Sequence, residues 1–316
     1  MLAAISSCFS TGKAQALPVQ QIRCFTAQTL DGFKLIISFF FDLGFSTAFQ
    51  INNAKLIRFL LAVHDLHHDG LHSWARTLES VQFMYYILTT TDLPEMFSKL
   101  ECFALFISAI CKDIDHYDFE DKSRSDIALA VLYRNRPVME MHHCEQAIRI
   151  ISKIEQNVFE NIDQEQQGQL WQMIISVILG TDMAQHFELV SKMRVLVYPQ
   201  MLFNAQSQQH RLLLAQIVVK SCDMSSTTRL FPVNEKWATH VGKFTKQVGK
   251  SETETREADQ LVVAKNHLGF IMLQALLAAR PLFEVLCETV PGLSPAFDRL
   301  NGNIDEWKKR IKANNP

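Results

Sequence analysis

The sequence has few of the residues that interrupt helices, with 11 glycines and 9 prolines among 316 residues. No window alternates polar and apolar residues between turn signals, so a substantial β-sheet is not expected. Long stretches instead repeat apolar residues at spacings of three and four, which is the pattern of amphipathic helices. The sequence therefore predicts a compact all-α protein of many helices.

A strong charge of either sign is also missing, because 31 Lys and Arg face 33 Asp and Glu, a formal net charge of −2. A nucleic-acid partner normally needs a clustered basic surface, so no such partner is expected. The most apolar window, Leu35 to Phe49, is interrupted by Asp42 and Gly44 and falls short of the roughly 20 residues that span a bilayer. No transmembrane segment is predicted.

The seven cysteines are scattered, and no two have C-x-x-C spacing. This usage predicts buried, reduced thiols in a cytoplasmic protein. Residues 1–20 lack the basic and apolar regions of a signal peptide, so we interpret them as a disordered lead-in. Two short polar breaks, Asp118–Asp126 and Gly249–Asp259, are interpreted as surface loops within a single domain spanning 21–316.

Three local patterns predict helix positions. An apolar stripe predicts one helix from His142 to Ile162. Asp163, with Gln166 three residues later, is a helix-start signal. Asp92, followed by a proline and a glutamate, predicts the start of the helix that contains the apolar run from Met96 to Cys111.

Three groups of acids and histidines lie far apart in the sequence, each at or near the end of an apolar helix. Burying an unpaired charge there would cost several kcal/mol, so convergence of the groups on one polar pocket is the favoured interpretation. The alternative is that they are surface acids and helix caps. The groups are Asp113, Asp115 and His116; Glu140, His142 and His143, followed by Asp182 and His186; and Asp223.

The order and spacing of several segments resemble the class I cyclic-nucleotide phosphodiesterases, whose catalytic domain is an all-helical HD-type metallohydrolase. LHSWARTLESVQFMYYIL resembles the family's Y-H-N-x-x-H segment, ICKDIDH its H-D-x-D-H motif, and VLYRNRPVMEMHHCEQA its L-Y-x-x-S-x-x-E-x-H-H motif. TDMA, KSCDMSSTTRLFPVNEKW and HLGFI resemble later motifs in the same order. The resemblance extends from about Lys55 to Ile311.

This resemblance implies 3′,5′-cyclic-nucleotide hydrolysis with divalent metals, namely zinc and usually magnesium, that activate a bridging water. The substrate would be cAMP or cGMP, and the implied protein partners are a second copy of the chain or a related phosphodiesterase. By position, His72 matches the proton donor, and Asp113 and Asp223 match metal ligands. The remaining matches are His116, Glu140 and Asp182, which would bond metal-bound waters, and Phe270, which would stack on the purine.

The departures from the family pattern carry more information than the matches. Arg76 and Lys112 stand where the two zinc histidines are expected, and neither can act as a ligand while protonated. His267 replaces the glutamine that orients the purine, and Ser226 replaces an asparagine of the base pocket. We expect tight zinc binding to be lost and the two cations to pair with Asp113 and Asp223.

An alternative register would make His72 a zinc ligand and His68 the acid, because the two have H-x-x-x-H spacing. It would break the gapless match of the following segment and leave Lys112 unexplained.

Three functional interpretations follow. The first is a pseudoenzyme of cyclic-nucleotide signalling, in which hydrolysis is weak or lost. The second is an active phosphodiesterase that uses a single magnesium ion bound by Asp113 and supported by His116, Glu140 and Asp182. The third is an unrelated helical scaffold.

Overall fold

The structure is a computed structural model that describes residues 29–68, 72–116, 131–133, 137–248 and 257–314. It describes their side chains except those of 29, 240–248, 257–271, 274 and 314. The expected lead-in 1–20, the first expected loop and most of the second lie outside the described residues. Within the described residues every regular element is a helix, which confirms the all-α prediction.

The chain divides into two compact units, with the boundary between Asp223 and Met224. The prediction of one domain over 21–316 stays a prediction. The first unit contains α2 (Thr29–Asp42), α3 (Phe45–Ala48), α4 (Asn53–Asp65), α5 (Trp74–Thr90), α6 (Leu93–Met96), α7 (Lys99–Cys111), α9 (Val138–Ile151), η2 (Ile154–Gln156), α10 (Gln164–Leu179), η3 (Met183–Gln185), α11 (His186–Val197) and α12 (Gln208–Asp223). The second contains η4 (Ser225–Thr228), α13 (Phe231–Val248), α14 (Glu257–Thr289), η5 (Pro291–Leu293) and α15 (Ser294–Asn314).

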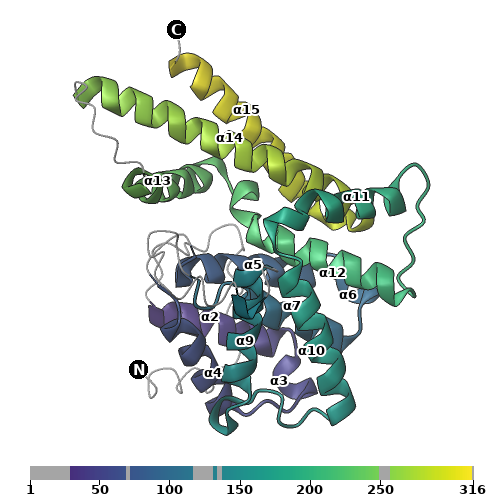
Figure 1. The fold of residues 1–316 in the computed structure, drawn as a ribbon. Helices are drawn as coiled ribbons and strands as arrows, with labels where there is room; N and C mark the ends of the chain where they lie inside the picture. Colours follow the sequence, from purple (N-terminus) through teal and green to yellow (C-terminus); the bar gives the residue numbers. More distant parts are fainter. Residues whose placement is uncertain (1–28, 69–71, 117–130, 134–136, 249–256, 315–316) are drawn as a thin grey trace. The chain divides into compact units, whose positions relative to one another are not determined.

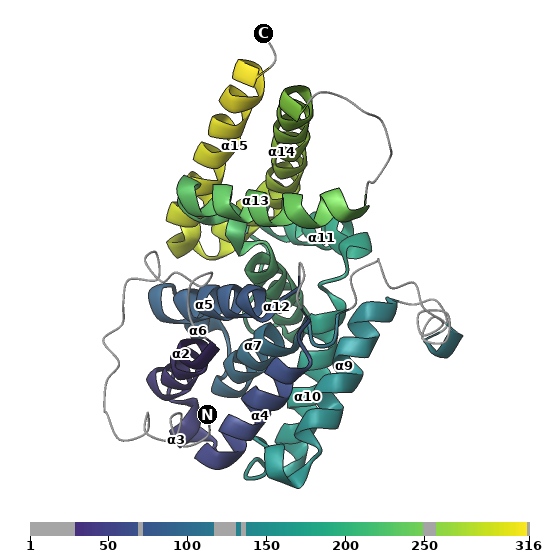
Figure 2. The same ribbon diagram turned by 90° about the vertical axis from the view of Figure 1, so that its left-hand side faces the viewer.

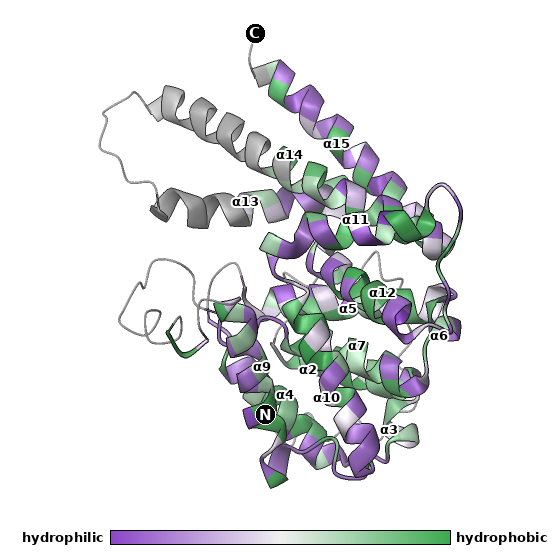
Figure 3. Ribbon diagram, turned by 45° about the vertical axis from the view of Figure 1, so that its right-hand side comes forward, coloured by the Kyte–Doolittle hydropathy of each residue, from purple (hydrophilic) through white to green (hydrophobic). Residues whose placement is uncertain are grey.

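Helix α7 lies in the middle of the first unit, where it packs against α5, α9, α10 and α12 (Figures 1 and 2). All ten residues from Cys102 to Cys111 are buried. A helix that is apolar on every side is stable only inside a core, and hydrophobic colouring is concentrated along α5 and α7 (Figure 3). The end of α7 therefore places the next residue, Lys112, inside the unit.

Aromatic rings join α7 to the N-terminal helices. Phe40, Phe45, Phe103 and Phe106 form one buried cluster, and Phe40 meets both Phe103 and Phe106 edge to face. Such pairs stabilise a core beyond the area they bury. The cluster thus anchors α2 and α3 to the helix that carries the site.

The start of α7 differs from the sequence prediction. Asp92 is the N-cap of only the four-residue helix α6, and the chain is extended at Phe97. Ser98 then begins α7 with a capping box, in which Ser98 and Glu101 satisfy each other's backbone N–H groups. The second start signal is confirmed, because Asp163 accepts a hydrogen bond from the Gln166 N–H at 2.9 Å.

The predicted helix from His142 to Ile162 is too long. Helix α9 ends at Ile151, and Ile154, expected on the apolar stripe, is 80% exposed. Val158 and Ile162 are buried, but they lie in turns. The nearby Phe159 packs edge-on against rings of α7 and α10, so tertiary packing turns the chain where the helical period would continue.

In the second unit, α14 and α15 pack side by side as an antiparallel pair joined by η5 (Figures 1 and 2). Side chains of α15 donate hydrogen bonds to the backbone carbonyls of η4 and of the residue that follows it, and to a side chain of α13. Asn303 donates to the Thr227 and Arg229 carbonyls at 2.9 and 2.8 Å, and Trp307 donates to Asn234 Oδ1 at 2.8 Å. These buried bonds define the conformation of the segment that contains Ser226.

Among the described residues no single helix has both the length and the apolarity needed to cross a membrane. One pair of helical segments bent by 80° has the length and composition of a broken span, namely Gln164–Leu179 with Met183–Val197.

Replacing Phe103 with Ala should lower the free energy of unfolding by about 3–5 kcal/mol, because it removes the ring shared by the aromatic cluster. The matched control is Phe41→Ala, since Phe41 is 44% exposed, and its loss should be at most about 1 kcal/mol. Urea unfolding of both variants measures the difference. Equal losses would contradict this description of the core.

Candidate functional site

Lys112 is the C-cap of α7, and its side chain is 1% exposed. Its ammonium donates a short hydrogen bond to Asp113 Oδ2 and another to Asp223 Oδ1 at 2.8 Å. Asp223 is the last residue of α12, which packs against α7. The ion pairs that the sequence predicted for Lys112 are therefore present, at the point where two helices end.

The three groups control one another's charge. Burial opposes the charged form of Lys112, but the carboxylates of Asp113 and Asp223 outweigh it and raise the pKa of Lys112. Burial also opposes charge on the aspartates. The ammonium of Lys112 outweighs that effect, holding the pKa of Asp113 well below its ordinary value and lowering the pKa of Asp223. All three groups are therefore ionised at neutral pH.

Arg76, in the first turn of α5, contacts the same aspartate. Its guanidinium donates a short hydrogen bond to the Asp223 carbonyl oxygen and lies 3.6 Å from Asp223 Oδ1. Its other terminal nitrogen lies 3.8 Å from Glu79 Oε2, a carboxylate whose side chain is only 4% exposed. Two cations thus face three carboxylates, not the two expected from the sequence.

A column of imidazole rings borders Asp113. The rings of His72 and His116 stack with centroids 3.6 Å apart, and His143 lies beyond His116 with centroids 5.3 Å apart. The Nδ1 of His72 is 3.5 Å from Asp113 Oδ1 and makes no hydrogen bond. One ligand atom from each of His72, Asp113 and His116 lies within 4.8 Å of the others.

Hydrogen bonds establish the tautomers in this column. The Nδ1–H of His143 donates to the Ile114 carbonyl at 2.6 Å. Burial lowers the pKa of His143 to about 3, so its ring is neutral and its Nε2 carries a lone pair. That nitrogen is 3.2 Å from His116 Nδ1, which must therefore be the donor. The His116 lone pair is accordingly placed on Nε2 whenever the ring is neutral.

Asp115 organises the turn that follows α7. Its backbone has a φ of +57°, in the left-handed region, and its N–H donates to the Leu66 carbonyl at 3.1 Å. Its carboxylate contacts His142 at 2.8 Å and His68 at 3.1 Å. Of the two histidines in the alternative register, His68 therefore contacts Asp115, while His72 lies beside Asp113.

Glu140 and Asp182, expected near metal-bound waters, form a second acidic pair. Burial raises the pKa of Glu140, and repulsion from Asp182 adds to the effect. The buried ammonium of Lys220 donates to the carbonyls of Gly180, Thr181 and Asp182 at 3.3, 3.0 and 2.9 Å. Lys220 thus caps the C-terminal end of α10 and positions Asp182, a role that was not predicted.

The three residues expected at the base-binding end belong to the second unit. Ser226 lies in η4, is 7% exposed, and accepts a hydrogen bond from Asn234 Nδ2 at its carbonyl, at 3.0 Å. His267 and Phe270 lie on α14, and their side chains are outside the described part of the structure.

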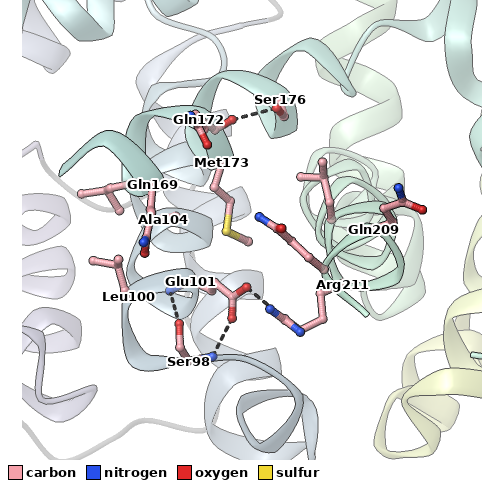
Figure 4. A pocket seen from close by; sticks show the side chains of 13 residues that line it. Ser98, Leu100, Glu101, Ala104, Gln169, Gln172, Met173, Ser176, Gln209 and Arg211 are labelled. Atoms are coloured by element: carbon pink, nitrogen blue, oxygen red, sulfur yellow. Dashed lines mark hydrogen bonds and ion pairs between the residues drawn. The ribbon is translucent and has the colours of Figure 1, made fainter. Parts of the chain in front are cut away.

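A pocket of about 640 Å³ lies elsewhere in the first unit, between the start of α7, α10 and the start of α12 (Figure 4). Its charged groups are matched to each other, because Arg211 Nε donates to Glu101 Oε1 at 3.0 Å while Glu101 also completes the α7 capping box. None of the sequence-predicted site residues lines it. The charged cluster at Asp113 and Asp223 therefore remains the candidate site.

A family model described as 3'5'-cyclic nucleotide phosphodiesterase matches residues 71–300. The chain belongs to this family. The high affinity cGMP-specific 3',5'-cyclic phosphodiesterase 9A proteins of Homo sapiens and Mus musculus are 30% identical to it over 260 residues, which cover 79% of this chain. The dual 3',5'-cyclic-AMP and -GMP phosphodiesterase 11A of Takifugu rubripes is 26% identical over 283 residues, or 86% of this chain.

The chain spans less than half the length of these relatives: 43%, 47% and 31%, respectively. Its fold also matches the phosphodiesterase domain of the RhoPDE fusion protein from the choanoflagellate Salpingoeca rosetta. That match has a TM-score of 0.82 and 21% identity, and covers 97% of this chain and 98% of that chain. The phosphodiesterase fold is thus present across almost the whole chain.

The residues around Asp113 and Asp223 do not fit a zinc ion. Arginine and protonated lysine offer no lone pair. Lys112 already bonds one oxygen of each aspartate, and Arg76 bonds the backbone of Asp223. A dication there would also be repelled by two cations, by several kcal/mol even at an effective dielectric of about 20.

Replacing Lys112 with Met should lower the free energy of unfolding at pH 7 by about 3–5 kcal/mol, because it leaves two buried carboxylates without their cation. The matched control is Lys55→Met, which removes a more exposed pair with Glu160 and should cost at most about 1 kcal/mol. Urea unfolding measures both. A loss at Lys112 no larger than that at Lys55 would contradict the description of the site.

The cost of Lys112→Met should also depend on pH. Because the pKa values of Asp113 and Asp223 are lowered in the folded state, these groups stabilise the fold above their unfolded pKa of about 3.9. This stability is lost as pH falls through their folded pKa values. The stability linked to the raised pKa of Lys112 is fully present below about pH 10.4, the unfolded pKa. It is lost as pH rises through the folded pKa. The difference between wild type and variant should therefore shrink below about pH 4. A constant difference from pH 7 to pH 3 would contradict this assignment.

Proposed function

We propose that this chain is a pseudoenzyme domain of cyclic-nucleotide signalling, in which hydrolysis of 3′,5′-cyclic nucleotides is weak or lost. The observation that carries the proposal is the Lys112 ammonium held between Asp113 and Asp223. In the family these aspartates are expected to bind the metal that activates water. Here an ammonium, which cannot act as a Lewis acid, lies between them and offsets part of their charge.

The retained histidine at position 72 does not restore the chemistry. A general acid contributes about 10²- to 10⁴-fold by protonating a leaving group. It acts only when a nucleophile is available to displace that group, and no residue of the cluster supplies one. His72 instead lies against Asp113 and stacks on His116.

The cationic pair is a poor phosphate site as well. Arg76 and Lys112 are matched by Asp113, Asp223 and Glu79, which leaves the group with a net charge of −1 when all are ionised. A cyclic phosphodiester carries a negative charge and would be repelled. The domain therefore acts through protein contacts in the cytoplasm, as a homodimer or as a regulatory partner of active phosphodiesterases.

The purified domain should show little turnover of cAMP or cGMP, and Arg76→His combined with Lys112→His should raise it by roughly 100-fold or more. The two histidines would restore the metal ligands, and a single preorganised electrostatic group at a transition state is commonly worth that factor. Product formation with added zinc and magnesium is the measurement.

The matched control is Arg76→Gln combined with Lys112→Gln, which removes both charges but provides no imidazole ligand and should stay inactive. Thermal melts establish that both double variants fold. Wild-type turnover as high as that of the histidine variant, and well above that of the glutamine control, would overturn the proposal. It would favour an active enzyme using one magnesium ion bound by Asp113 and supported by His116, Glu140 and Asp182.

A further inference from the structure

Exposed apolar side chains are concentrated along α11 and the start of the loop that joins it to α12 (Figure 1). Among the described residues, 13 large apolar side chains are exposed, and six of them lie between positions 183 and 202. A soluble surface seldom gathers apolar side chains in this way unless it is an interaction site. The six are Met183, Phe187, Val195, Tyr198, Met201 and Leu202.

Helix α11 has an inner and an outer face. Buried side chains, Leu189 and Met193 among them, form the inner face, and the helix packs against α12. The outer face carries Phe187, Ser191 and Val195, which are spaced four residues apart and so follow one line along the helix. Phe187 is 70% exposed and Val195 is 64% exposed. The outer face is thus a row in which a small residue separates two apolar ones.

We infer that this outer face pairs with the same face of a second copy of the chain, as two antiparallel α11 helices that cross at Ser191. A twofold interface joins identical patches, so the patch must be its own complement. Phe187 and Val195 lie four residues before and after Ser191. In an antiparallel pair centred there, Phe187 of each copy lies at the level of Val195 of the other. The small serine at the crossing point allows the two helices to approach closely.

The charges of α11 complement themselves in the same arrangement. Glu188 lies in the first turn and Lys192 one turn later, with the two charged groups 2.6 Å apart and more than half exposed. An antiparallel partner presents the opposite order, so Glu188 of each copy lies within one turn of Lys192 of the other. A parallel partner would instead place Glu188 beside its own copy, and like charges disfavour that pairing. The charge pattern therefore selects an antiparallel second copy.

The loop after α11 extends the paired surface. The backbone N–H groups of Leu202 and Phe203 donate to the Leu196 carbonyl at 2.7 and 3.0 Å, which folds the loop back beside the end of the helix. One helix pair with this flank is a small interface, and interfaces below about 1,200 Å² are typically weak and transient. A micromolar dimer is therefore expected. The inference names the surface of a homodimer and rests on the proposed function only for the role of that dimer.

A cysteine at the crossing point tests the twofold axis. Sedimentation velocity of the purified full chain should show a monomer–dimer equilibrium between about 1 and 100 µM. Oxidation of Ser191→Cys with copper phenanthroline should link two copies, because residues at the crossing point have the short Cα separation of about 4.4–6.8 Å that a disulfide needs. Ser152→Cys, at the exposed end of α9, is the matched control and should cross-link no more than wild type.

Charge reversal tests the orientation of the pair. Glu188→Lys and Lys192→Glu should each raise the dimer dissociation constant by at least about 10-fold, because each puts like charges together twice by symmetry. The double variant should recover wild-type affinity. The matched control is Arg149→Glu, which breaks the exposed pair with Glu145 on α9 and should leave the dimer unchanged.

Truncation of the exposed ring tests the apolar contact. Phe187→Ala should also raise the dissociation constant by at least about 10-fold, as loss of a central aromatic anchor commonly does. The matched control is Phe41→Ala, an exposed ring on α2 that should leave the dimer unchanged. Far-UV circular dichroism and thermal melts establish that each variant folds.

Three results would overturn the inference. They are a wild type that stays monomeric at about 100 µM, cross-linking of Ser191→Cys no greater than that of Ser152→Cys, and failure of the double charge variant to recover the dimer. Turnover of cyclic nucleotides is measured separately. A monomer without turnover would overturn only this inference, and a dimer with full turnover would overturn only the proposed function.

Discussion

The ammonium of Lys112 reaches Asp113 and Asp223 from the end of a helix that is buried from Cys102 to Cys111. None of the three charges is tolerable there alone, since an unpaired buried ion destabilises a fold by several kcal/mol. Together they join the end of α7 to the end of α12. Arg76 adds α5 to the same junction, so three helices of the first unit converge on one group of ion pairs.

This arrangement accounts for the preservation of the fold alongside the altered site. In the phosphodiesterase family, a metal would supply the positive charge between the two aspartates. In this chain the charge is carried on covalently attached side chains, and it is permanently present. Under the proposed function, the site retains the helix junction while lacking a means to activate water.

Sequence patterns located the principal charges of this junction because the motifs have a constant spacing relative to α5, α7 and α12. They did not identify Glu79, whose only signal is an acid three residues after Arg76 within an apolar run. The presence of helices was easier to predict than the residues at which they end. Periodicity carried the predicted helix through Ile154, whereas Phe159 packs against α7 and α10 and turns the chain earlier.

Other features had no local signal in the sequence. The left-handed backbone of Asp115 depends on a hydrogen bond to Leu66 and on contacts with two histidines from other segments. Lys220 lies in an apolar stretch that predicts a buried helix face, yet its ammonium satisfies three carbonyls at the end of α10. Such contacts connect residues between 27 and 49 positions apart and follow only from tertiary structure.

Anomalous diffraction at the zinc edge, from crystals grown with zinc, tests the central claim most directly. The account predicts no anomalous peak between Asp113 and Asp223, where the Lys112 ammonium should be found. A strong peak coordinated by both aspartates, with the Lys112 side chain turned away from them, would contradict it.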